Sequence, residues 1–176
     1  MTSTILLAYA TTDGHTLRIC QRLQQRLSTI GQNALVHPID AVDAVLLARS
    51  EKIVIGASIR YGKHSPGVNR FIETHRGLLE SRPSAFFSVN LVARKPDKNQ
   101  PETNPYARRF LAKISWKPRL AAVFAGRLDY PRYKPLDRFV IRLIMAITGG
   151  PTDPAAVVEF TDWDAVDRFA DQIAQF

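Results

Sequence analysis

The sequence predicts an α/β fold in which a parallel sheet carries helices on both faces. Short apolar segments bounded by turn-forming residues recur along the chain, as expected for strands buried on both sides of a sheet. Between them lie longer segments whose apolar residues repeat at helical spacing. Strands that alternate with helices in this way favour a parallel sheet over an antiparallel one.

In the first half of the chain, buried strands are predicted at residues 5–9, 34–37 and 52–57. An amphipathic helix follows the first strand from Thr16 and ends at Gly31. A short helix is expected around residues 41–48. A longer one is expected from Pro66, which suits a first helical turn, to Leu79.

In the second half, strands are predicted at residues 84–92 and 121–125, with a helix at 106–116 between them. A basic, aromatic and apolar stretch then extends to Gly150. A further strand piece is expected at residues 157–160, followed by a final helix that Asp162 caps.

The composition is that of one soluble globular domain covering residues 1–176. The chain is 45% hydrophobic and 23% charged, and no linker divides it. Cys20 is the only cysteine, which excludes an intrachain disulfide and favours a reducing compartment; we expect it to be a small packing residue. We expect no signal peptide, and the apolar stretch at residues 139–147 is too short for a bilayer core of about 30 Å.

The net charge of +8 is concentrated in one part of the chain. Residues 94–142 hold thirteen Lys or Arg and four acids, whereas the remainder is close to neutral. This distribution indicates an anionic partner: nucleic acid, an acidic lipid surface, or a substrate that carries carboxylates.

The segment Thr-Thr-Asp-Gly-His-Thr at residues 11–16 lies between the first strand and its helix. Its hydroxyls, its turn glycine and the free N–H groups of a helix end suit a phosphate monoester. The three-glycine dinucleotide pattern and the Gly-Lys-Ser/Thr triphosphate pattern are both absent from this segment. We therefore predict a phosphate held without a cationic side chain or metal. The alternative is that Thr16 merely caps the helix and Asp13-Gly14 forms a tight turn.

Two later loops should meet this phosphate loop, because ligands of open α/β sheets lie beyond the carboxyl ends of the strands. The loop after the third strand offers Tyr61 for stacking and Gly62 for close backbone approach. The loop after the fourth strand offers residues 88–91 and then Arg94 and Lys95. Together these residues could hold a planar isoalloxazine ring, although Tyr61 taken alone is more typical of a packing residue.

Three segments carry a resemblance to a known family: the phosphate loop, Val-Ile-Gly-Ala-Ser-Ile-Arg-Tyr-Gly at residues 54–62, and Pro-Ser-Ala-Phe-Phe-Ser-Val-Asn-Leu-Val-Ala-Arg-Lys-Pro at residues 83–96. They resemble the flavodoxin-like, quinone-dependent protoporphyrinogen IX dehydrogenases. Shorter matches extend the likeness over nearly the whole chain, at residues 104–107, 130–133, 137–139, 149–150 and 161–163. The second and third segments distinguish this family from ordinary flavodoxins.

The resemblance implies a three-layer, flavodoxin-like fold with five parallel strands in the order 2-1-3-4-5. It implies that the last strand is split, here into residues 121–125 and 157–160, by a basic amphipathic insertion at about 127–156. It also implies FMN as the cofactor. The residues expected to bind FMN are Thr11, Thr12, Asp13, Gly14, His15, Thr16, Ser58, Ile59, Arg60, Tyr61, Gly62, Phe86, Phe87, Ser88, Val89, Asn90, Leu91 and Val92.

The implied reaction is the oxidation of protoporphyrinogen IX to protoporphyrin IX for haem synthesis. FMN would take the electrons in two-electron steps, and a membrane quinone (menaquinone or ubiquinone) would reoxidise it. Because arginine pairs well with carboxylates, we hypothesise that basic residues near the ring hold the two propionates of the substrate. The candidates are Arg60, Arg94, Lys95, Arg132 and Tyr133; a solvated basic surface is the alternative.

The insertion carries apolar residues from Leu136 to Ile147 at helical spacing, with Arg138 and Arg142 near the edge of that face. Such a helix could lie in a lipid interface, with the protein peripheral to the cytoplasmic face of the inner membrane. Alternatively, the same face could pack against the sheet as ordinary core. The residues alone leave both interpretations open.

Two rival function classes remain at this stage. A flavodoxin-type electron carrier between proteins is the first, although such carriers are usually acidic and this chain has a pI near 10.0. A nucleic-acid-binding module is the second, but it leaves the phosphate and ring-binding loops unexplained. The four histidines and Cys20 show no metal-ligand spacing, so we predict no metal site. No catalytic acid or base can be named; His64 could relay a proton or lie at the surface.

Overall fold

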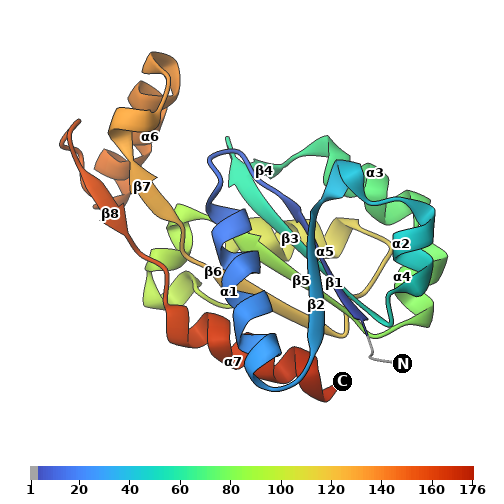
Figure 1. Ribbon diagram of the computed structural model, residues 1–176. Coiled ribbons are helices and arrows are strands. Elements are labelled where there is room, and N and C mark those ends of the chain that lie inside the picture. Colours follow the sequence, from blue (N-terminus) through green and yellow to red (C-terminus); the bar gives the residue numbers. More distant parts are fainter. Residues whose placement is uncertain (1–3) are drawn as a thin grey trace.

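The computed structural model, which describes residues 4–176, confirms the α/β class (Figure 1). Five parallel strands form the central sheet in the order β2-β1-β3-β5-β6, which matches the predicted order of the five main strands. Their bounds are β1 Thr4–Ala10, β2 Asn33–Pro38, β3 Lys52–Arg60, β5 Ser84–Val89 and β6 Leu120–Phe124. A short strand, β4 (Lys63–His64), pairs antiparallel with the end of β3.

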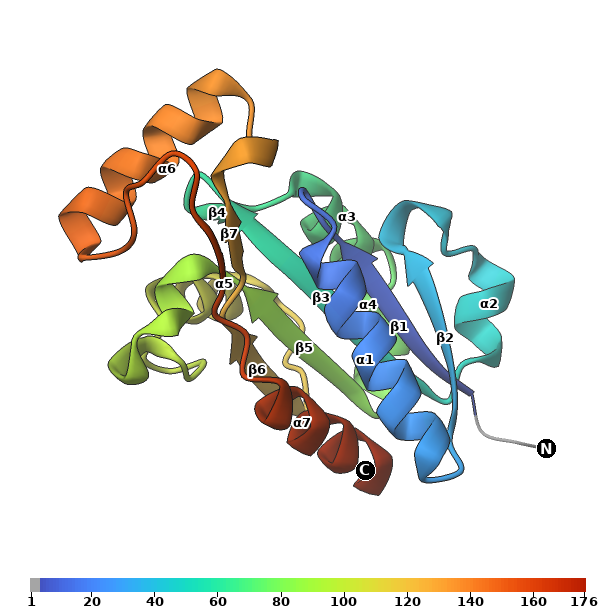
Figure 2. The same cartoon turned by 60° about the vertical axis from the view of Figure 1, so that its left-hand side comes forward.

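Helices cover both faces of this sheet (Figure 2). On one face lie α1 (His15–Thr29) and α7 (Trp163–Gln175), and on the other lie α2 (Ala44–Arg49), α3 (Pro66–Thr74), α4 (Arg76–Ser81) and α5 (Pro105–Lys113). Single 3-10 turns occur at Ile39–Ala41, Leu91–Arg94, Pro96–Lys98 and Tyr130–Arg132. The single helix predicted over residues 66–79 is two helices, because the backbone leaves helical geometry at His75 (φ −110°, ψ 16°).

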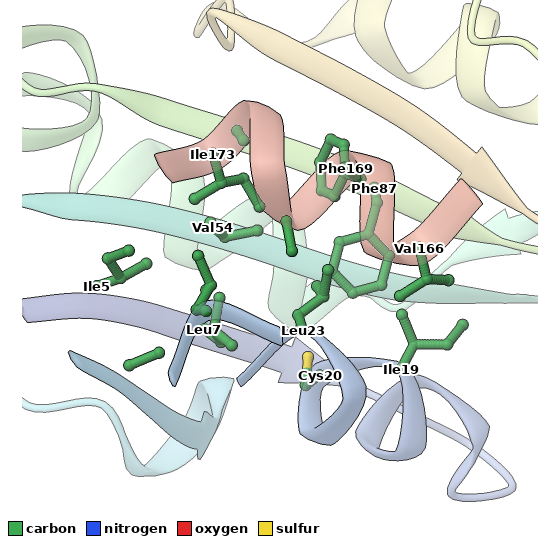
Figure 3. Close-up of a cluster of buried hydrophobic side chains, with 14 of the residues drawn as sticks. Ile5, Leu7, Ile19, Cys20, Leu23, Val54, Phe87, Val166, Phe169 and Ile173 are labelled. Carbon is green, nitrogen blue, oxygen red and sulfur yellow. The ribbon is translucent and has the colours of Figure 1, made fainter. Parts of the chain in front are cut away.

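The larger core cluster lies between the sheet and the pair α1–α7 (Figure 3). Cys20 is wholly buried there, as predicted, and burial raises the pKa of its thiol. This packing fixes α1, and with it the phosphate loop, against the carboxyl ends of the strands. The side chains that meet in Figure 3 include Ile5, Leu7, Val54 and Phe87 from the strands, Ile19 and Leu23 from α1, and Val166, Phe169 and Ile173 from α7.

The insertion adopts a different arrangement from the one expected. It forms β7 (Arg127–Asp129), a 3-10 turn, α6 (Pro135–Thr148) and β8 (Val157–Glu159). β8 does not resume the fifth strand of the main sheet; it pairs antiparallel with β7 in a separate two-stranded sheet. The chain continues from β6 through Gly126 into β7. When it returns after α6 as β8, it pairs with β7 and not with any strand of the main sheet. Figure 1 shows α6 and this ribbon projecting from the main sheet.

The exposed face of α6 settles how the helix packs. Only Met145 among its residues is buried, whereas four apolar side chains at helical spacing are largely exposed: Leu136 (70%), Phe139 (68%), Leu143 (53%) and Ile147 (77%). Of the two interpretations that the sequence left open, packing against the sheet as core does not hold for these four residues. Within residues 4–176, no helix has the length and apolarity needed to span a bilayer.

Candidate functional site

A narrow cavity of about 120 Å³ lies at the carboxyl ends of the strands, where the strand order reverses between β1 and β3. This is where open α/β sheets bind ligands. The three loops expected to converge do so here. The predicted residues that line the cavity are Thr11, Asp13, His15, Ser58, Ile59, Arg60, Tyr61, Gly62, Val89, Asn90, Leu91, Val92 and Tyr133.

The phosphate loop is built to receive an anion. Gly14 adopts a left-handed conformation (φ 84°), and its N–H donates to the Thr11 hydroxyl over 3.0 Å. Helix α1 then begins without a side-chain cap and without an acid in its first turn, so its first N–H groups stay available. The Thr16 hydroxyl is wholly buried and has no hydrogen-bond partner within the described chain. A buried hydroxyl without a partner is unfavourable, and a phosphate oxygen would supply that partner.

His15 links this loop to the end of the insertion. Its Nε2 lies 2.7 Å from the Thr161 hydroxyl and 3.4 Å from a carboxylate oxygen of Glu159. Burial lowers the pKa of His15, and Glu159 only partly opposes that effect. The ring therefore orients the loop through Thr161, while its buried Nδ1 has no partner in the described structure.

The loop after β3 is a tight hairpin, and the two residues at its tip line the cavity. Tyr61 (φ 52°) and Gly62 (φ 76°) both have left-handed backbones, as in a type I′ turn between paired strands. For tyrosine this conformation is strained, and such strain concentrates at functional loops. The Tyr61 hydroxyl donates to the carboxylate of Asp137, in the first turn of α6.

Arg60, which directly precedes Tyr61 in this hairpin, also lines the cavity. Its guanidinium forms an ion pair with Asp13 of the phosphate loop at 2.5 Å and lies 5.6 Å from the centre of the Tyr133 ring. Arg60, Tyr61 and Tyr133 thus line the cavity together.

A buried amide pair holds the loop after β5. The Asn104 side chain donates to Asn90 Oδ1 over 3.0 Å and caps the start of α5 through the N–H groups of Tyr106 and Ala107. Asn90 in turn accepts from the Ala93 N–H at 3.1 Å. The pair thus fixes both the loop that lines the cavity and Tyr106, whose side chain joins that lining.

Three residues of β5 that were expected to contact the flavin have side chains that do not line the cavity. Phe86 and Phe87 are wholly buried in the two separate cores, because successive side chains of a strand point to opposite faces of the sheet. Ser88 is not among the residues that line the cavity, and its hydroxyl lies 3.0 Å from Nε2 of His64. His64 is itself 9% exposed, not a surface residue, and burial lowers its pKa to about 4.

The remaining predicted residues lie beside the cavity or away from it. Thr12 lines an adjoining cavity, while Gly14 and Arg132 line a third hollow at the phosphate loop. Arg94 and Lys95 line none of these three cavities. The Arg94 guanidinium is engaged with the last turn of α6, where it donates to Thr148, so the hypothesis that it holds a propionate is not supported by its position.

Six further residues line the cavity although the sequence did not predict them as binding residues: Tyr106, Gly126, Arg127, Ile141, Ile144 and Met145. Tyr106 lay within a matching segment, at the start of a predicted helix. The three residues of α6 belong to the apolar repeat whose packing partner the sequence left open. No cluster of metal-ligating side chains occurs among residues 4–176.

Known proteins with similar sequences have names that are consistent with a flavin site at this position. Residues 6–155 match the flavodoxin domain family. The chain is 46% identical over 169 residues to the protoporphyrinogen IX dehydrogenase [quinone] of Escherichia coli K12, covering 96% of this chain and 93% of that protein. It is also 46% identical to the protein of the same name from Leishmania major, covering 96% of this chain and 74% of that one.

Solved structures show the same fold at low identity. Oxidised flavodoxin 1 from Bacillus cereus superposes with a TM-score of 0.57 at 13% identity, over 98% of both chains. An archaeal flavodoxin superposes with a TM-score of 0.56 at 16% identity. Flavodoxin domains bind FMN, and the unpartnered Thr16 hydroxyl at an uncapped helix start fits the phosphate of that cofactor. The chain therefore belongs to the flavodoxin domain family and, within it, to the quinone-dependent protoporphyrinogen IX dehydrogenases.

Proposed function

We propose that this protein oxidises protoporphyrinogen IX to protoporphyrin IX, with FMN as its cofactor and a membrane quinone as the electron acceptor. The observation that carries the proposal is the identity of 46% over almost the whole chain to the E. coli enzyme of that name. The conversion removes electron pairs and protons from the porphyrinogen in successive steps, and each pair reduces one quinone to a quinol.

Bound FMN would supply the redox chemistry by accepting electron pairs from one substrate and releasing them to the other. The residues of the chain bind and orient it. Thr16 and the first turn of α1 would hold the phosphate, and the loops at residues 58–62 and 89–92 would flank the ring. Ile141, Ile144 and Met145 add an apolar wall from α6 that limits access of water.

We further propose that α6 rests in the headgroup region of the membrane that contains the quinone. Its exposed apolar stripe (Leu136, Phe139, Leu143 and Ile147) is typical of an interfacial helix, and Arg132, Lys134 and Arg142 lie exposed beside it. Cations at such a boundary favour anionic headgroups. Because the other side of α6 lines the flavin cavity, a quinone in the bilayer would have a short route to the ring, and the protein would be peripheral to the cytoplasmic face of the inner membrane.

The decisive experiment uses the purified, FMN-loaded protein under anaerobic conditions. We expect the fluorescence of protoporphyrin to appear from protoporphyrinogen when a quinone is added, and not without one. An electron carrier of the flavodoxin type would hold FMN equally well but would form no porphyrin under either condition. That result would overturn the proposed reaction.

A further inference from the structure

A second and larger cavity, of about 830 Å³, adjoins the flavin cavity. Four residues line both of them: Thr11, Ser58, Arg60 and Tyr61. The second cavity extends to the opposite side of the hairpin from α6, toward the end of β2 and the start of α3. Figures 1 and 2 both show α3 and α6 on opposite sides of the carboxyl edge of the sheet.

The charge of this cavity comes from two cations placed opposite each other. Arg60 and Lys63 are register partners across the β3–β4 hairpin, so their side chains emerge on the same face. Like charges directly opposite each other destabilise a strand pair. Asp13 offsets only Arg60, and within residues 4–176 Lys63 forms no ion pair. The one acid that lines the cavity, Asp40, lies beside Gly67 in the first turn of α3.

An exposed aromatic ring sits between these cations in the sequence. Tyr61 is 55% exposed at the tip of the hairpin and lines both cavities, with its backbone held at a positive φ. The hairpin thus presents a cation, an aromatic ring and a second cation next to the flavin cavity. A planar ligand with two carboxylates matches this set, because carboxylates pair with cations and flat apolar rings pack on tyrosine.

We propose that this second cavity is the subsite for the two carboxylates of the porphyrinogen, with Lys63 and Arg60 as their partners. The proposal rests on the proposed function and adds a specificity residue to it: Lys63, which lies outside the matching segments. The tetrapyrrole would extend from these cations along Tyr61 toward the flavin ring. The two substrates would then approach from different sides of the hairpin, the quinone along α6 and the porphyrinogen from the side of α3.

The test measures binding without turnover. Protoporphyrin IX and its dimethyl ester, which lacks free carboxylates, are titrated into FMN-loaded protein in mild detergent, with binding followed by porphyrin fluorescence anisotropy. The variants are Lys63→Gln and Lys63→Glu, with Lys113→Gln as the control. Lys113 is exposed like Lys63, lies on α5, and lines neither cavity.

We expect Lys63→Gln to weaken protoporphyrin binding about threefold and Lys63→Glu about tenfold or more, as for partly exposed ion pairs. Neither variant should change the affinity for the dimethyl ester, and Lys113→Gln should leave the affinity for both ligands unchanged. Equal affinities for protoporphyrin in all four proteins, or an equal loss for acid and ester, would overturn the subsite. Absence of quinone-dependent turnover in the wild-type protein would instead overturn the proposed reaction. Failure of the subsite and failure of the reaction can therefore be told apart.

Discussion

Arg94 and Thr148 join the loop that follows β5 to the last turn of α6. The Arg94 guanidinium donates to the Thr148 carbonyl over 3.1 Å and to its hydroxyl over 2.9 Å, while a second nitrogen holds the Leu91 carbonyl at 3.0 Å. Gly150 leaves room for this contact, since a Cβ there would overlap Met145 and lie 3.0 Å from the guanidinium. Arg94 is therefore a positioning residue that ties the insertion to the flavin cavity.

Replacement of Arg94 by alanine should loosen α6 from the rest of the domain. Removal of its hydrogen bonds leaves the Thr148 carbonyl in the last turn of the helix without this partner, at a cost of about 1–3 kcal/mol. We expect faster hydrogen exchange over residues 141–148 and a smaller change for Arg94→Lys, which keeps one donor. Unchanged exchange in α6 for Arg94→Ala would contradict the positioning role.

Replacement of Thr16 by valine should weaken FMN binding about tenfold, because the hydroxyl is the buried donor left for the phosphate. Riboflavin, which has no phosphate, should bind both proteins alike. Quenching of flavin fluorescence measures both affinities. Thr29→Val, at the far end of α1, is the matched control; equal losses for FMN and riboflavin would show that the effect is not at the phosphate.

Replacement of Phe139 or Ile147 by glutamine should weaken binding to anionic vesicles about tenfold, since each removes a large apolar side chain from the proposed interface. Co-sedimentation with anionic and with zwitterionic vesicles measures the partition. Val45→Gln is the control, because Val45 is also an exposed apolar residue (57%) but lies on α2. If all three variants partition equally, α6 is not the membrane contact.

Acid should destabilise the fold through His64. Burial, which disfavours the charged ring, lowers the pKa of His64 from its ordinary value of 6.5 to about 4. The unfolded chain therefore takes up this proton at a higher pH than the folded one does. The stability contribution is complete above about pH 6.5 and is lost as the pH falls toward 4.

Urea unfolding at pH 7 and pH 4.5 should show this loss as roughly 2–3 kcal/mol in the wild-type protein beyond the loss in His64→Gln. The variant keeps a donor for Ser88 but cannot titrate in this range. The comparison removes the contribution of the carboxylates, which both proteins share. Parallel losses in the two proteins would mean that His64 is not held neutral by the fold.

Replacement of Gly56 by alanine should destabilise the centre of the sheet. A Cβ at this position would overlap the Phe87 ring, which is wholly buried against α7 and cannot swing away. Overpacking of this kind costs about 1–3 kcal/mol, measurable by thermal unfolding. The double variant Gly56→Ala, Phe87→Leu should recover part of the loss. No recovery would place the cost elsewhere, in the backbone of β3.

The sequence by itself determined the α/β class and the position of the strand–helix loop at residues 11–16. Its resemblance to a known family determined the order of the five main strands. These features depend on local patterns: apolar runs, helical spacing, and a glycine next to hydroxyls at a strand–helix junction. The loop residues that line the cavity were predicted for the same reason, since strand ends in a parallel sheet converge wherever the strands pair in that order.

Only the tertiary structure decided the rest of the site. Phe86 and Phe87 lie in a motif that resembles a flavin-binding segment, yet their side chains face the two cores because of the alternation along β5. The role of Arg94 depends on where the C-terminus of α6 lies, more than fifty residues further along the chain. The pairing of β8 with β7, and the opposition of Arg60 and Lys63 across a hairpin, likewise depend on which segments meet. Such long-range pairings are set by the free energy of the whole packed chain, and no local pattern encodes them.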